Sequence, residues 1–199
     1  MKMKLAAISL LCCIACVANA QMGSTTTTTT TTQPDASKPF DAIWTIIEKE
    51  VVSAAEAMPA EKYGFAPSQA IFKDSQKTDF ASPTPVRAFG GEVAHVAQAN
   101  YYFFSSFAAE KPDADMAAMD KLTTKAEIVA ALKKSFAYGH RAIATITVQN
   151  AFVGVGPKQA ATPAGMTDFA SMHCMDHYGQ MVVYLRMNGI VPPASAPQK

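Results

Sequence analysis

The sequence predicts an all-α protein, a four-helix bundle, and three observations support this fold class. Apolar residues recur at helical spacing in four long stretches, and no stretch between them alternates as a strand would. Apolar residues make up 49% of the chain and charged residues 17%, which provides material for one packed core. Four long helices with apolar faces and no strands pack most simply as a bundle.

The first 20 residues have the pattern of a secretory signal peptide. Lys2 and Lys4 give a short basic region, 5–17 is apolar, and 18–20 has alanine at its first and third positions. The apolar run is too short for a stable membrane-spanning helix. We therefore expect export by the general secretory route, with the mature chain beginning at Gln21 in the periplasm or outside the cell.

Cysteine placement bears on membrane attachment and on disulfides. The stretch from Cys13 to Cys16 loosely resembles a bacterial lipobox, so lipidation at Cys16 is the alternative that would tether the protein to a membrane. Otherwise we expect no membrane partner. Cys174 alone follows the predicted signal, so the mature chain should contain no intramolecular disulfide.

The charge balance argues against nucleic acid as a partner. The chain has 17 Lys and Arg against 16 Asp and Glu, and removal of Lys2 and Lys4 leaves 15 against 16. A nucleic-acid binder normally carries a clear basic excess. We expect a small-molecule substrate instead, and self-association into a homodimer is left open.

A threonine-rich linker precedes the predicted domain. Residues 21–38 include eight consecutive threonines at 25–32 and no apolar periodicity, a composition typical of disorder. The bundle is then expected over 39–193, with 194–199 as a short tail.

The first two helices are expected on either side of a long loop. The first covers 39–58 and ends at Pro59, and prolines with polar residues make 65–86 a loop of a length that is often functional. The second begins at 84–86 and ends near 109. Gly90 and Gly91 weaken its first turns, which suggests close approach of another helix or of a ligand.

The last two helices have clear start signals. Thr124 and Glu127 form a capping box before a helix expected over 125–150. Thr162 as N-cap and Pro163 in the first turn begin the fourth helix, which should end at Asn188 and Gly189.

The candidate metal ligands lie on the second and fourth predicted helices. His173 and His177 are one helical turn apart, so both imidazoles lie on one face and could bind one metal ion. His95 is the candidate third ligand from across the bundle. The residue pattern alone equally allows hydrogen-bonded core histidines. His140, beside Lys133, Lys134 and Arg141, is assigned to the solvated surface.

Asp176 and Glu92 are the candidate catalytic residues. Asp176 neighbours His177, Glu92 lies one turn before His95, and either could orient a ligand or act as a base. Tyr178 and Arg186 are weaker candidates. Cys174 follows His173 about 100° further round the helix, so its thiol should point off the ligand face.

Competing motifs fit this sequence less well. His173, Asp176 and His177 resemble the inverted zinc-protease motif, but with aspartate in place of glutamate. Glu92 and His95 form half of a di-iron signature that has no second copy here. The Cys-x-x-Cys-His motif of c-type haem is missing, whereas a b-type haem held by Met and His stays open.

Three stretches have an order and spacing typical of one family. They read MPAEKYGFAP at 58–67, RAFGGEVAHVA at 87–97, and HCMDHYGQ at 173–180, followed by YLR at 184–186 and GIVPP at 189–193. On these residues the domain resembles the DinB superfamily, the DinB/YfiT-like metal-binding bundles. The resemblance implies up-down-down-up topology and one divalent metal held by His95, His173 and His177, with open positions for water or substrate. Zinc and nickel both suit imidazole ligands.

The resemblance also implies candidate activities. Characterised members include thiol-dependent enzymes, such as mycothiol-dependent maleylpyruvate isomerases and bacillithiol transferases, and many members have no known activity. An exported chain departs from them, because cytosolic thiol cofactors are not expected to be abundant outside the membrane. We expect a metal-dependent hydrolase or thiol transferase acting on a small molecule. The alternative is a non-catalytic metal-binding or structural bundle.

Overall fold

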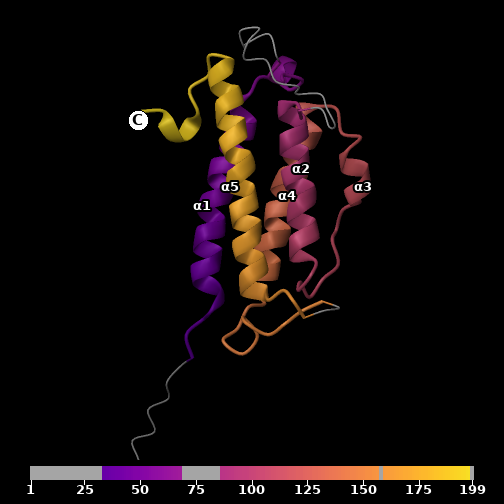
Figure 1. Ribbon diagram of the computed structural model, residues 1–199, viewed down its shortest axis with the longest axis vertical. Helices are drawn as coiled ribbons and strands as arrows, with labels where there is room; N and C mark the ends of the chain where they lie inside the picture. Colours follow the sequence, from indigo (N-terminus) through magenta and orange to yellow (C-terminus); the bar gives the residue numbers. More distant parts are fainter. Residues whose placement is uncertain (1–32, 69–85, 157–158, 198–199) are drawn as a thin grey trace, which may run out of the picture. The chain divides into compact units, whose positions relative to one another are not determined.

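The computed structural model describes residues 33–68, 86–156 and 159–197 (Figure 1). The predicted signal peptide, most of the predicted linker and much of the predicted loop at 65–86 lie outside these ranges. The α-helices are α1 (Ser37–Ala57), α2 (Phe89–Phe104), α3 (Met116–Met119), α4 (Lys125–Ile143) and α5 (Pro163–Met187). Two short 3-10 helices are η1 (Ala60–Lys62) and η4 (Pro193–Ser195).

The described ranges are helical, as the sequence predicts. They contain no β-strand, only an isolated antiparallel bridge between Val155 and Ala161. None of the described helices combines the length and apolar character that a membrane span needs. The all-α prediction is therefore confirmed for this part of the chain.

The four long helices pack as one bundle, in which α1 and α2 each lie against both α4 and α5 (Figure 1). Lys125, at the start of α4, donates a hydrogen bond to the Glu56 carbonyl near the end of α1, so these helices run in opposite directions. Tyr184, near the end of α5, donates to the carbonyl of Arg87 just before α2. The helices α2 and α5 are therefore antiparallel as well.

The core between α1 and α4 is built around one indole. Trp44 is fully buried, its ring centroid lies 4.8 Å from those of Phe104 and Phe136, and its Nε1 donates to the Phe136 carbonyl. Gly139 allows this approach, because a Cβ there would lie 2.7 Å from Trp44 Nε1. Each aromatic pair adds about 0.5–1.5 kcal/mol beyond the burial of its area.

Two helices have bounds that differ from the sequence prediction. The helix expected to reach 150 ends at Ile143, where the Thr145 and Ile146 amides bond carbonyls three residues back. The Asn150 side chain then donates to the Thr145 carbonyl, so side-chain bonds replace the helical ladder. The second predicted helix is shorter at both ends, and hydroxyls of Ser105 and Ser106 bond carbonyls of its last turn.

The start of α2 is held by the segment that follows α1. The Gly90 amide donates to the Tyr63 carbonyl at 2.8 Å, and the Phe89 amide donates to the Phe65 carbonyl at 2.8 Å. A Cβ on Gly90 would lie 3.0 Å from the Tyr63 ring. The close approach predicted at this glycine pair is present, and the neighbour is the residue that follows η1.

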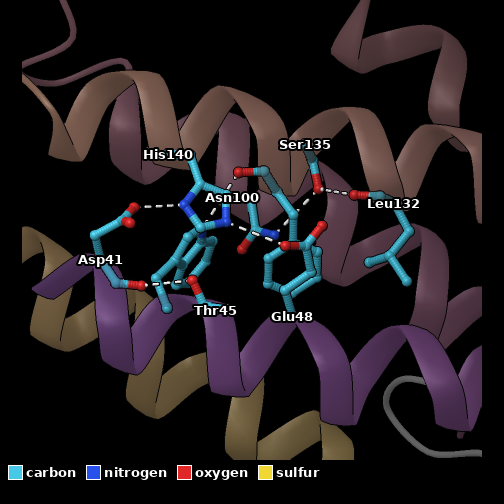
Figure 2. Close-up of polar contacts among 9 residues, drawn as sticks. Asp41, Thr45, Glu48, Asn100, Leu132, Ser135 and His140 are labelled. Carbon is cyan, nitrogen blue, oxygen red and sulfur yellow. Dashed lines mark hydrogen bonds and ion pairs between the residues drawn. The ribbon is translucent and has the colours of Figure 1, made fainter.

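A buried polar network joins three helices in the bundle interior. Cys174 Sγ on α5 donates to Asn100 Oδ1 on α2 at 3.2 Å, and Asn100 Nδ2 donates to Ser135 Oγ on α4 at 3.1 Å. Ser135 Oγ donates to the Leu132 carbonyl at 2.7 Å, as Figure 2 shows. The buried side-chain amide of Asn100 is thereby paired through both its oxygen and its nitrogen, which offsets its burial.

His140 does not lie among cations, contrary to the sequence prediction. Figure 2 shows its ring on α4 between two carboxylates of α1, with Nδ1 2.5 Å from Asp41 and Nε2 3.1 Å from Glu48. A histidine can donate from both nitrogens only as imidazolium. Partial burial lowers the pKa of His140, but the two hydrogen bonds and the carboxylate charges outweigh it, and the net direction is upward.

This arrangement predicts pH-dependent stability. Because the folded pKa of His140 is raised, its stabilising contribution is complete below the ordinary value of about 6.5 and is lost as pH rises through the folded value. Chemical denaturation of wild type and His140→Gln at several pH values should show the largest difference in unfolding free energy at low pH. A difference that grows as pH rises would contradict the assignment.

Candidate metal centre

Three histidines meet between α2 and α5. The ring centroid of His95 lies 5.2 Å from that of His173 and 4.7 Å from that of His177, and the last two lie 4.5 Å apart. Each ring offers one nitrogen as a ligand atom, and these three nitrogens lie within 4.8 Å of one another. These three side chains could hold one metal ion, with α2 providing one ligand and α5 two.

Glu92 orients one of these rings from across the bundle. The residue is 2% exposed, and Oε2 lies 2.5 Å from His177 Nδ1. An imidazole that donates from Nδ1 to a carboxylate presents the lone pair of Nε2 on its other side, which is the usual arrangement of a metal-bound histidine. The contact explains why a buried glutamate is tolerated between two helices.

His173 supplies the observation that tests whether the residues fit a metal. Its Nε2 is buried, and no hydrogen-bond partner lies within reach in the described part of the chain. Buried polar atoms are nearly always satisfied, and each exception calls for an explanation. Coordination of a metal ion would satisfy this nitrogen, so the donor set fits the group.

The surroundings favour the neutral form of two of the ligands, His95 and His173. Burial, then the charge of Arg87, then His177 and His173 lower the pKa of His95 to about 4. Burial, followed by the proximity of His177, also lowers the pKa of His173. Only neutral imidazole binds a metal, so protons compete weakly at neutral pH.

The sequence model of the DinB superfamily matches residues 44–181, a range that contains all three histidines. The chain belongs to the DinB superfamily. The resemblance inferred from sequence is thereby confirmed, and with it the expectation of a helical fold. Among curated proteins, none matches the chain.

Other residues singled out from the sequence of this DinB protein form hydrogen bonds with groups other than the three histidines. The exposed Asp176 carboxylate accepts a hydrogen bond from Gln180 at 3.5 Å. The Tyr178 hydroxyl donates to Glu50 on α1 at 2.6 Å, and burial, then that bond, raise the pKa of Tyr178 to about 12. Arg186 lies near Ser195 at the end of the described chain. Glu92 is thus the acidic candidate whose carboxylate bonds a ligand histidine.

Sequence reasoning missed two residues of this DinB site. Arg87 and Gln98 line a cavity beside His95. Arg87 lies two residues before α2, beside Gly91, where a Cβ would lie 3.6 Å from its side chain, so helical spacing along α2 alone would not have identified it.

The Glu92 contact generates a prediction for metal affinity. Glu92→Gln keeps the size of the side chain and an acceptor oxygen but removes the charge that holds the His177 ring. We expect zinc affinity to fall about 10–100-fold, the usual effect of losing such a partner. Competition with a chromophoric chelator measures it.

Glu50→Gln is the matched control, because Glu50 accepts a hydrogen bond from Tyr178 on α5 but contacts none of the three histidines in the described structure. Equal losses in both variants would show that the carboxylate effect is not specific to the centre.

Proposed function

We propose that this protein is an exported, metal-dependent hydrolase or group transferase that acts on a small molecule. The observation that supports the proposal most directly is the set of His95, His173 and His177, with a carboxylate on His177 and an unpartnered nitrogen on His173. Three protein ligands are typical of catalytic rather than structural sites, because they leave a position for water or substrate.

The bound metal would supply Lewis acidity and lower the pKa of a bound water or thiol toward neutrality. The residues of the chain have separate tasks. Glu92 holds the Nδ1 proton of His177, and burial keeps His95 and His173 neutral. We propose Asp176 as a second carboxylate near the centre, because its charge raises the pKa of His173 against the dominant effect of burial.

Zinc and nickel are the metals we propose, because an all-imidazole set suits both and excludes the hard cations that prefer oxygen. The helix directions support the up-down-down-up order within the bundle, since α1 opposes α4, α2 opposes α5, and the start of α2 is hydrogen-bonded to Tyr63, which follows the end of α1. A small-molecule substrate is supported by cavities beside His95. Nucleic acid and membranes are not proposed as partners.

Export predicts the mass of the mature protein. Cleavage after Ala20 should leave Gln21 at the N-terminus, and the intact mass of protein recovered from the extracytoplasmic fraction measures it. A mass that retains residues 1–20 would contradict the proposal. A diacylated Cys16 would replace it with the lipoprotein alternative and membrane attachment.

Metal content tests the site. The wild type should bind about one divalent ion per chain at neutral pH, and affinity should fall as pH drops toward about 4, the pKa of His95. His95→Ala, His173→Ala and His177→Ala should each lose most of the metal, and bound metal should raise the melting temperature of the wild type by mass action. Elemental analysis and calorimetry are the measurements.

Two variants serve as controls in that series. His140→Ala should keep the metal, because His140 bonds Asp41 and Glu48. Cys174→Ser should keep it because Sγ points to Asn100, and burial raises the pKa of the thiol, which disfavours a thiolate ligand. If either control lost the metal as readily as His173→Ala, the three-histidine assignment would be wrong.

A further inference from the structure

Two cavities flank the candidate metal centre, and their walls differ in character. The larger, about 660 Å³, lies at the start of α2, and Arg87 and Asp120 are among its walls. The smaller, about 420 Å³, is lined mainly by apolar side chains, among them Phe103 and Met116. His95 and Gln98 line both cavities, so the two spaces lie on either side of this turn of α2.

One face of α2 connects the two cavities. Gly91, His95, Ala99 and Tyr102 follow one another at intervals of three or four residues and so share that face. Gly91 places no side chain between Arg87 and His95, and a Cβ there would meet only the Arg87 side chain, at 3.6 Å and beyond. The wall of the larger cavity is therefore open from the arginine to the ligand histidine.

Arg87 has a fixed backbone and an exposed side chain. Its carbonyl accepts a hydrogen bond from the hydroxyl of the buried Tyr184. The amide of Phe89, two residues later, donates a hydrogen bond to the Phe65 carbonyl. Arg87 and His95 line the same cavity, so a molecule bound there can contact the guanidinium and reach the candidate metal centre. Guanidinium stays charged at all relevant pH and matches the geometry of carboxylates and phosphates.

The apolar cavity presents aromatic and thioether surface at the opposite side of His95. Phe103 lies edge-on to His173 with ring centroids 5.2 Å apart, so an aromatic wall continues to a second ligand. Tyr102 is 68% exposed, which leaves its ring available to a bound molecule. Gln98 Nε2 donates to the Met116 carbonyl at 2.8 Å and ties α3 to this wall.

We propose that the site takes an elongated amphipathic small molecule. Its carboxylate or phosphate binds Arg87 in the larger cavity, its aryl or alkyl part fills the smaller cavity, and its reacting group lies at the three histidines between them. This inference rests on the proposed function and adds the class of substrate. Asp120, on the α3 side of the larger cavity, disfavours a second negative charge there and accepts a hydrogen bond from a substrate N–H or O–H.

A three-part probe tests this arrangement. N-(2-Benzyl-3-sulfanylpropanoyl)glycine carries a thiol for the metal, a benzyl group and a carboxylate. Its affinity for the zinc-loaded protein is measured by calorimetry beside the neutral glycinamide and the analogue without benzyl, and the zinc content of every protein is determined first. We expect each deletion to weaken binding by about tenfold.

Protein variants show which cavity is responsible for each loss of probe affinity. Arg87→Gln should remove the difference in affinity between the acid and the glycinamide. Tyr102→Ser should reduce the affinity gained from the benzyl group about threefold. Gly91→Leu should place a side chain between Arg87 and His95 and weaken binding of the acid while zinc content stays unchanged. Lys49→Gln and Val148→Ser, exposed changes outside both cavities, should preserve both preferences.

The outcomes separate the two proposals. A wild type without zinc overturns the metal-centre proposal and this inference with it. A zinc-loaded wild type that fails to bind the probe, or whose acid preference survives Arg87→Gln, overturns this inference alone, because the carboxylate then binds elsewhere. Stronger acid binding in Asp120→Asn, with no effect of Arg87→Gln, would show that the larger cavity selects a cation.

Discussion

The hydrogen bond between Glu92 and His177 is the contact on which the site and the local packing both depend. A carboxylate with 2% exposure is costly unless it is paired, and its partner here is a ring on another helix. The bond therefore fixes the relative position of α2 and α5 at the level of the three histidines. Because one ligand comes from α2 and two from α5, the same contact that satisfies a buried charge also assembles the donor set.

Much of the bundle could be predicted from local signals. The capping box at Thr124 and the Thr162–Pro163 start are properties of a few adjacent residues, and both are present in the structure. The helical spacing of His173 and His177 likewise depends on one helix alone. These features need no knowledge of how helices pack, which is why the sequence was sufficient for them.

The remaining features depend on contacts between helices. Glu92 was placed near His95 by spacing, whereas its carboxylate bonds His177, a choice set by the distance between α2 and α5. His140 has cationic neighbours in sequence, yet it faces two acids of α1. Helix α3 is a single turn begun by Asp115, too short for any apolar period to reveal. Partners across a bundle depend on rotation about each helix axis, which no single sequence stretch encodes.

The network of Cys174, Asn100 and Ser135 has a consequence for the choice of ligand. Cys174 is the residue after His173, so a rotation of α5 by one position would turn the thiol toward the place that the imidazole occupies. Such a rotation would break the bond from Sγ to Asn100, itself tied to α4 through Ser135. The buried amide thus holds α5 in the rotation that directs an imidazole nitrogen, and not the thiol sulfur, toward the candidate metal centre.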